Sequence, residues 1–189
     1  MRSSYSSRDV VILLKDITGQ IQPMAARERE KAIQSGIHYS ELLPLEYRPT
    51  EVYMELYREA LALHGEKTAR AAAVLAEKIW QKKKEQVTLV SLARAGTPIG
   101  ILIKRYLDRK YQVCLPHYSI SIIRDRGIDH NAMDYILARH SRETIQFVDG
   151  WIGKGTISRE LEKEMKGYPG ISPDQAALSD PARLTDLYG

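Results

Sequence analysis

Thr144-Ile-Gln-Phe-Val-Asp-Gly-Trp-Ile-Gly-Lys-Gly-Thr156 reads as an apolar strand that ends at Asp149, then a glycine-rich turn, then a threonine that opens a helix. A helix N-terminus leaves backbone N–H groups free to bind an anion. Glycines in such a turn, here Gly150, Gly153 and Gly155, let the backbone approach a ligand closely. The carboxylate at the strand tip can accept hydrogen bonds from sugar hydroxyls. The stretch therefore predicts a pocket for a sugar phosphate.

Strand and helix patterns alternate over residues 87–189 around this stretch. Apolar runs read as strands at 87–92, 112–123 and 144–149, and helical periodicity covers 99–109, 130–140 and 155–166. A further strand is expected to begin at Gln175. This alternation predicts an α/β fold with a parallel sheet and flanking helices, in which ligands lie beyond the carboxyl ends of the strands.

The first part of the chain, residues 1–86, reads as a mostly helical N-terminal extension of an α/β core at 87–189. Helical patterns cover 24–35, 51–63 and 67–84, with Thr50 as an N-cap and Gly65 as a helix end. The apolar run at 10–14 fits a short strand or a buried helix. Three or four strands make a thin sheet, so we expect the C-terminal part of the core to be incomplete.

Composition narrows the class of protein. The chain has 189 residues, 43% of them hydrophobic, which is enough for a sizeable core, and no apolar run reaches the roughly 20 residues that span a bilayer. A single cysteine forms no intrachain disulfide and the N-terminus lacks a secretory signal, so we expect a cytoplasmic protein without a membrane partner. The net charge of +4 suits an anionic small ligand, whereas nucleic-acid binding would need a concentrated basic patch.

A second strand, turn and helix stand at Val90-Ser-Leu-Ala-Arg-Ala-Gly-Thr-Pro98. Its arginine, Arg94, can donate a bidentate pair of hydrogen bonds to phosphate. The turn belongs to the same sheet edge as the glycine loop, so we expect Ser91, Ala95 and Gly96 to join it in binding substrate. The alternative is a tight turn with a surface arginine.

The charged loop at residues 124–129 contains two cations, Arg124 and Arg126, two acids and a hinge glycine. Such a loop could close over an anionic substrate and exclude water. A solvated surface loop is an equal alternative.

Two nucleotide-binding motifs are excluded by spacing. A phosphate loop of NTPases needs a lysine directly after its last glycine, but here Lys154 precedes Gly155 and Thr156 follows it. The dinucleotide fingerprint G-x-G-x-x-G is absent as well.

Cys114 raises the alternative of a cysteine nucleophile. On a strand, His117 would point to the opposite face, so the two side chains would not pair unless Pro116 interrupts the strand. We therefore favour a buried, unreactive cysteine. The five histidines show no metal-ligand spacing, and we expect no metal held by the protein alone.

The two loops resemble those of type I phosphoribosyltransferases. Phe147-Val-Asp-Gly-Trp-Ile-Gly-Lys-Gly-Thr156 is similar to the loop that holds their diphosphate sugar, and the turn at 91–96 is similar to their pyrophosphate loop. The sequence departs from that family at Gly150, where a second acid is usual. The chain is closer to a subgroup, the phosphoribosyltransferase-like proteins of bacterial tellurite-resistance and stress-response operons, some of which carry the label cysteine protease of the StiP type. That similarity rests also on His117-Tyr-Ser-Ile-Ser-Ile-Ile-Arg-Asp-Arg-Gly-Ile-Asp129, Tyr5-Ser-Ser-Arg-Asp9 and Glu46-Tyr-Arg-Pro49.

The resemblance implies binding of phosphoribosyl diphosphate with substrate-bound Mg²⁺, and transfer of ribose phosphate to an unknown, nucleobase-like acceptor. Asp149 would hold the ribose hydroxyls, the loop from Gly153 to Thr156 the 5′-phosphate, and Arg94 the pyrophosphate, with Arg124 and Arg126 closing over it. A hydrolase that uses Cys114 and a non-catalytic sensor of a nucleotide or sugar phosphate are the alternatives. A homodimer is compatible with this interpretation.

Overall fold

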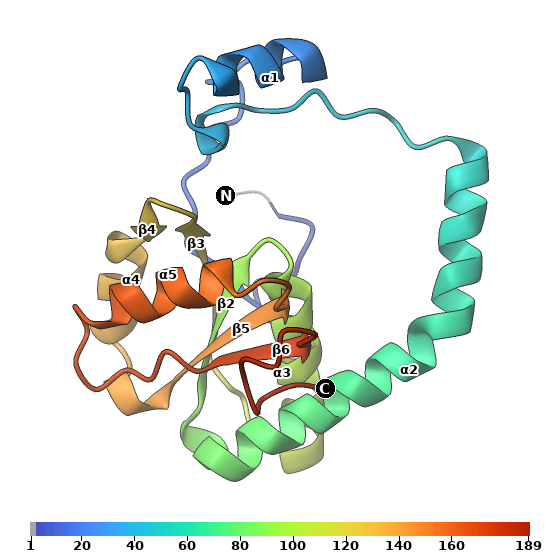
Figure 1. Ribbon diagram of the computed structural model, residues 1–189. Coiled ribbons are helices and arrows are strands. Elements are labelled where there is room, and N and C mark those ends of the chain that lie inside the picture. The colour runs from blue at the N-terminus through green and yellow to red at the C-terminus, as the bar shows by residue number, and fades with distance from the viewer. Residues whose placement is uncertain (1–2) are drawn as a thin grey trace. The chain divides into compact units, whose positions relative to one another are not determined.

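The computed structural model describes residues 3–189, and its strands form one mainly parallel sheet (Figure 1). The strands lie in the order β1-β3-β2-β5-β6, and a short β4 pairs antiparallel with β3. Their bounds are Val11–Ile12, Thr88–Ala93, His117–Ile123, Gly127–Ile128, Ile145–Trp151 and Gln175–Ser179 for β1 to β6. The predicted α/β class is thereby confirmed, and so are the strand expected at Gln175 and the strand interpretation of the run at 10–14.

Five α-helices accompany the sheet in the described part of the chain: α1 Ala26–Gln34, α2 Glu51–Lys83, α3 Gly96–Tyr111, α4 His130–Leu137 and α5 Thr156–Met165. Short 3₁₀ turns lie at Tyr39–Glu41, Lys84–Gln86 and Arg142–Thr144. The expectation of a helix end at Gly65 is wrong, because α2 runs through it. A single glycine costs a helix interior only about 1 kcal/mol, which the alanine-rich sequence that follows can offset.

The sheet is buried on both faces, as parallel sheets generally are. Phe147 and Val148 are both 0% exposed and belong to different apolar clusters, because successive side chains of a strand point to opposite faces. One cluster includes α4 and α5 through Met133, Ile136 and Leu161. The other includes α3 and the second half of α2 through residues such as Ile103, Leu75 and Ile79.

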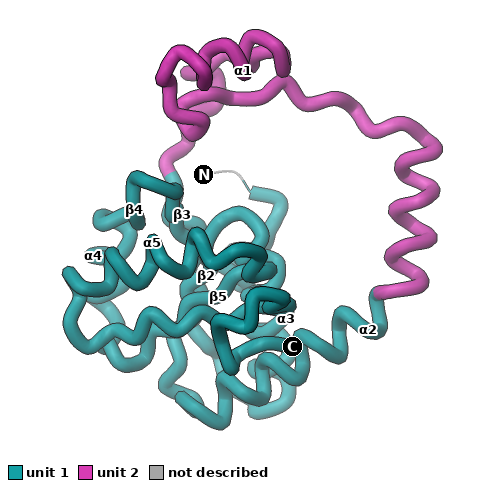
Figure 2. Tube along the Cα trace, in the orientation of Figure 1, with its two compact units in different colours: residues 1–14, 65–189 teal, residues 15–64 magenta. Residues whose placement is uncertain are grey.

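The chain divides into two compact units, shown in different colours in Figure 2. Unit 1 comprises residues 1–14 and 65–189, and unit 2 comprises residues 15–64. This division differs from the expected boundary at residue 86. The physical reason is that β1 pairs with β3, and that Leu75 and Ile79 of α2 are completely buried in the core of unit 1.

Unit 2 has little internal packing. Every residue of 15–64 is described, and none of them is buried. A parallel bridge joins Met24 to Pro44, and Thr50 caps α2 as predicted, its hydroxyl accepting the Tyr53 N–H at 3.2 Å. Few buried apolar contacts mean that local opening of this unit costs little free energy.

Among residues 3–189, no helix is both long enough and apolar enough to cross a membrane.

Candidate functional site

Two loops leave the carboxyl edge of the sheet side by side. Strands β2 and β5 are parallel neighbours, with Ser91 opposite Val148. After β2 the chain turns at residues 94–95 and enters α3, and after β5 it turns at 152–155 and enters α5. The structure therefore brings the two loops expected from the sequence to one edge, each followed by a helix N-terminus.

The turn after β2 touches the last residues of β5, just before the glycine-rich loop, and glycines make the contact. A Cβ added to Gly150 would lie 2.7 Å from the Cβ of Ala95, and a Cβ added to Gly96 would lie 2.3 Å from the carbonyl oxygen of Val148. Both distances are too short for a side chain. Packing therefore explains why position 150 is a glycine here, where type I phosphoribosyltransferases usually have a second acid. In this backbone arrangement the turn after β2 occupies the space that an acidic side chain would need.

The glycine-rich loop at residues 152–155 ends in a left-handed residue directly before the N-terminus of α5. Gly155 has φ +70°, a left-handed conformation that favours glycine, and no side chain caps the first turn of α5. A pocket of about 210 Å³ lies here, lined by residues that include Asp149, Lys154 and Thr156. Uncapped N–H groups beside a pocket can bind an anion.

A nearby cation, Arg159, was not identified from the sequence. Its guanidinium donates to the carbonyl oxygen of Lys154 at 3.1 Å and to the hydroxyl of Thr156 at 3.5 Å. It lies one turn into α5, and only its helical spacing from Thr156 could have indicated it. Arg159 adds positive charge to the loop and supports its backbone.

Asp149 is held by two hydrogen bonds. Its Oδ1 accepts the Gly150 N–H at 2.7 Å, and its Oδ2 accepts the Gln175 side-chain amide at 3.0 Å. Gln175 is itself 4% exposed and accepts a hydrogen bond from the Ser158 hydroxyl at 2.7 Å. Burial raises the pKa of Asp149 above its ordinary value, and the two hydrogen bonds act in the opposite direction. The sequence did not indicate Gln175, since 26 positions separate it from Asp149.

The turn after β2 exposes Arg94 and Ala95 but not Ser91. Ser91 is 0% exposed, and its hydroxyl lies 3.0 Å from the carbonyl oxygen of Gly96 and 2.7 Å from Nε2 of His117. The expectation that Ser91 itself binds substrate is therefore corrected, because the sheet and α3 enclose its side chain. Ser91 holds the turn from behind instead.

The charged loop is a β-hairpin turn between β3 and β4. Arg124 is largely exposed and pairs with its neighbour Asp125 at 3.3 Å. The hairpin is fastened to α5, because Glu160 accepts the Asp125 N–H at 3.1 Å. Arg124 thus follows β3 at the same sheet edge, but it pairs within its own turn rather than with either loop.

Cys114 is exposed, so the expectation of a buried cysteine is wrong. It precedes β3 and therefore lies at the amino edge of the sheet, opposite the two loops. Cys114 lies in the irregular segment between α3 and β3, where Leu115 is buried and Cys114 is not. Cys114 lines a pocket of about 470 Å³ together with His117 and His140.

Neither histidine of that pocket is paired with the thiol. His117 uses both ring nitrogens elsewhere, with Nδ1 2.8 Å from the carbonyl oxygen of Asp9 and Nε2 on Ser91. Burial lowers the pKa of His117 to about 4, and the buried ring is neutral at pH 7. Nε2 of His140 lies 2.8 Å from the hydroxyl of Tyr118, and burial, with a smaller effect of Arg139, lowers the pKa of this histidine.

The fold and this edge define an α/β protein with two adjoining loops, each followed by a helix N-terminus, beyond the carboxyl ends of a parallel sheet. The chain belongs to the family described as tellurite-like stress resistance cysteine protease StiP, whose model matches residues 3–189. A curated relative, the cysteine protease StiP of Acinetobacter baylyi, is 42% identical over 163 residues. These residues make up 86% of this chain but only 42% of the relative, so the chain spans less than half the length of that protein.

Two solved structures are similar in part. Xanthine-guanine-hypoxanthine phosphoribosyltransferase of Helicobacter pylori has 18% identity and a TM-score of 0.44, over 64% of this chain and 76% of that one. A hypothetical protein from Neisseria gonorrhoeae with bound ppGpp has 14% identity and a TM-score of 0.38, over 59% of this chain and 65% of that one.

Proposed function

We propose that the carboxyl edge of the sheet binds phosphoribosyl diphosphate with Mg²⁺ and transfers ribose phosphate to a nitrogen of a nucleobase-like acceptor. The observation that carries this proposal is the contact between Ala95, in the turn after β2, and Gly150, at the end of β5. It puts an uncapped helix N-terminus, a carboxylate and an exposed arginine at one edge. A diphosphate-bearing sugar needs two phosphate sites and a group for its hydroxyls, and these elements correspond to that need.

Different residues would bind different parts of the ligand. N–H groups at residues 153–156 would bind the 5′-phosphate, and the Asp149 carboxylate would accept hydrogen bonds from ribose hydroxyls. Arg94 would stabilise the charge that develops on the departing pyrophosphate. Arg124 and Arg126 would approach after movement of their hairpin, which would exclude water from the bond that breaks.

The chain offers little to hold a metal by itself. Within residues 3–189 no group of three histidine, cysteine or acidic side chains could hold a metal ion. Asp149 is one carboxylate, and Mg²⁺ in proteins is often bound through one or two carboxylates together with substrate phosphates. The ion would therefore enter on the diphosphate, where it would neutralise phosphate charge.

Calorimetry with phosphoribosyl diphosphate and Mg²⁺ tests the proposal. Asp149→Asn removes a charged acceptor and should weaken binding roughly 10- to 100-fold, since hydrogen bonds to charged groups contribute about 1.5–3 kcal/mol. Thr156→Ala should weaken it less. Asp134→Asn, which changes an exposed carboxylate of α4, is the matched control and should bind as the wild type does. No heat with the wild type would refute binding, and binding without pyrophosphate release would identify a sensor.

A thiol hydrolase at the opposite edge is the second candidate. The exposure of Cys114 beside a pocket lined by His140 favours it, and the curated relative is named a cysteine protease. Peptidase activity lost in both Cys114→Ala and His140→Ala, with the activity of Asp149→Asn unchanged, would support it. Cys114→Ala with full activity would exclude it.

A homodimer remains a prediction. Light scattering over a range of protein concentrations, with reductant present to keep Cys114 reduced, would test it. A constant mass near 21.5 kDa, the mass of one chain, would contradict it.

A further inference from the structure

A chain of hydrogen bonds crosses the core from the N-terminal segment to the turn after β2. Nδ1 of His117 lies 2.8 Å from the carbonyl oxygen of Asp9, and Nε2 lies 2.7 Å from the hydroxyl of Ser91. That hydroxyl lies 3.0 Å from the carbonyl oxygen of Gly96, the first residue of α3. His117 is only 3% exposed, so water has little access to replace these partners.

Counting hydrogens assigns the tautomer. The carbonyl of Asp9 can only accept, so Nδ1 of His117 carries the hydrogen, and Nε2 of the neutral ring is an acceptor. Ser91 has a single hydroxyl hydrogen and faces two acceptors, Nε2 and the carbonyl of Gly96. The hydroxyl can donate to only one of them at a time, so the two acceptors compete for this hydrogen, and Ser91 links the imidazole to the turn.

Close packing holds this arrangement in place. A Cβ added to Gly100 would lie 2.2 Å from the Ser91 hydroxyl oxygen and 2.4 Å from Nε2 of His117. The first turns of α3 thus lie directly on the pair. A side chain at Gly100 would displace them.

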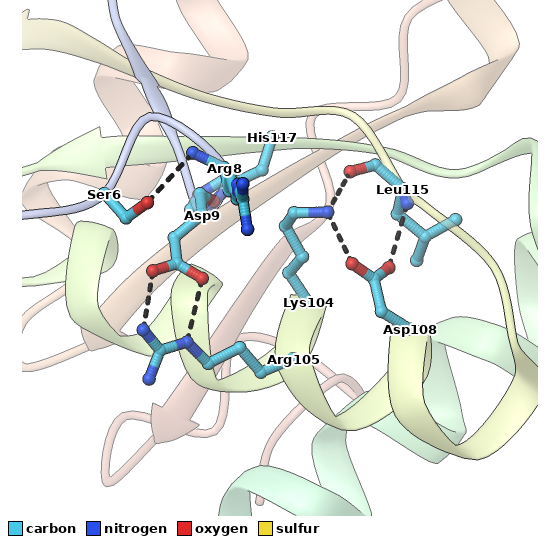
Figure 3. Close-up of polar contacts among 8 residues, drawn as sticks. All are labelled: Ser6, Arg8, Asp9, Lys104, Arg105, Asp108, Leu115 and His117. Atoms are coloured by element: carbon cyan, nitrogen blue, oxygen red, sulfur yellow. Dashed lines mark hydrogen bonds and ion pairs between the residues drawn. The ribbon is translucent and has the colours of Figure 1, made fainter.

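The far end of the chain of hydrogen bonds is anchored as well. The Asp9 carboxylate receives two hydrogen bonds from Arg105 of α3, at 2.8 and 2.6 Å, which hold its pKa below the ordinary value (Figure 3). Lys104, on the same helix, donates to the carbonyl oxygen of Leu115 at 2.7 Å and pairs with Asp108. The N-terminal segment is therefore bound to α3 through the Asp9 side chain and to β3 through the Asp9 carbonyl.

We propose that His117 is a positioning residue for the turn at residues 94–96, acting through Ser91, and that it links the segment at Asp9, before the amino end of β1, to that turn. This role rests on the proposed function. His117 would touch neither phosphate nor sugar. It would keep the Gly96 carbonyl, and with it the backbone N–H groups of the turn, in the position that receives the diphosphate.

Ser91→Ala tests the link, with Thr88→Val as its matched control. Both delete a buried hydroxyl from β2, but the hydroxyl of Thr88 lies 3.0 Å from that of Thr144 at the other end of the strand. Ser91→Ala should weaken binding of phosphoribosyl diphosphate with Mg²⁺ about three- to tenfold, the effect of one net hydrogen bond. Thr88→Val should stay within about twofold of the wild type on the same scale.

Nitrogen NMR of histidine-labelled protein, read together with backbone amide signals, gives a second readout that simple loss of stability would not produce. The ligand-free wild type should show His117 with hydrogen on Nδ1. Ser91→Ala should move the Nε2 resonance and the amide signals of Arg94 and Gly96, whereas Thr88→Val should leave them in place. If Ser91→Ala does not fold, Ser91→Cys, a weaker donor, takes its place.

The outcomes separate the two proposals. A wild type that does not bind the ligand refutes the proposed function, and the ligand-free spectra then decide whether His117 positions the turn. A wild type that binds, with Ser91→Ala binding equally well and its turn signals unmoved, overturns the positioning role alone. Hydrogen on Nε2 instead of Nδ1 would also overturn it.

Discussion

Replacing Gly150 with alanine tests the contact on which the candidate site depends. The new Cβ would lie 2.7 Å from the Cβ of Ala95 and 3.2 Å from its carbonyl oxygen. Carbon atoms pack best at about 3.5–4.0 Å, so the turn after β2 would have to move by about 1 Å. Overpacking of this kind costs about 1–3 kcal/mol, and we expect about 2 kcal/mol for Gly150→Ala.

Urea unfolding measures this change, and two further variants identify its cause. In Gly153→Ala, in the loop that follows β5, the new Cβ meets nothing within 4 Å, and the free energy of unfolding should change by less than about 0.5 kcal/mol. Ala95→Gly removes the clashing methyl group. It should lose up to about 1 kcal/mol alone, but should recover most of the cost of Gly150→Ala when the two are combined.

The double-mutant cycle should therefore show a favourable coupling of about 1–2 kcal/mol between positions 95 and 150. The reasoning is refuted if Gly150→Ala is as stable as the wild type, or if Ala95→Gly does not reduce its cost. Calorimetry on the same variants should show that Gly150→Ala also weakens ligand binding, because the clash separates the two loops.

Three further predictions concern other parts of the molecule. Burial lowers the pKa of His117 from 6.5 to about 4, so the unfolded chain binds a proton at a higher pH than the folded protein does. The contribution of His117 to the free energy of unfolding should be full above pH 6.5, and the free energy should fall by up to about 3 kcal/mol as the pH drops toward 4. Urea midpoints that do not change over this range would contradict the prediction. Cys114 should react with one equivalent of a thiol reagent in the native protein, and a thiol that reacts only after denaturation would show that it is covered. Limited trypsin digestion should cut first within residues 15–64, which have few buried contacts. The fragments should stay together on size-exclusion chromatography, because β1 and the ion pair from Asp9 to Arg105 hold the N-terminal fragment to the rest of unit 1. First cuts in unit 1 would contradict this prediction.

Local patterns in the sequence predicted the parts of the site that depend on neighbouring residues. The apolar run before Asp149 and the glycines after it define the strand and the turn, and Thr156 begins α5 as expected. The strand at Gln175 was predicted for the same reason, since its apolar run is continuous. Such features need only the backbone preferences of a few adjacent residues.

The rest of the site depends on contacts between distant parts of the chain. The amide of Gln175 reaches Asp149 across a strand pair, and the carbonyl of Asp9 meets His117 although 108 positions separate them. Neither contact leaves a periodic pattern in the sequence. Ser91 was expected to bind substrate because residues 91–96 resemble a pyrophosphate loop; its place in a strand was predicted correctly, but not that the sheet and α3 enclose its side chain. Cys114 was misjudged because a short apolar segment does not show which of its sides faces solvent.

The pairing of β1 with β3 delays the folding of the first strand during synthesis. Val11 pairs with Tyr118, so about a hundred residues must be made before the first strand finds its partner. At 5–20 residues per second, the apolar run at 10–14 waits on the order of 5–20 s on the ribosome without a sheet to join. Strand β1 is thus translated first but can pair only after β3 has emerged, and during this interval the nascent chain is open to chaperones or to wrong pairing.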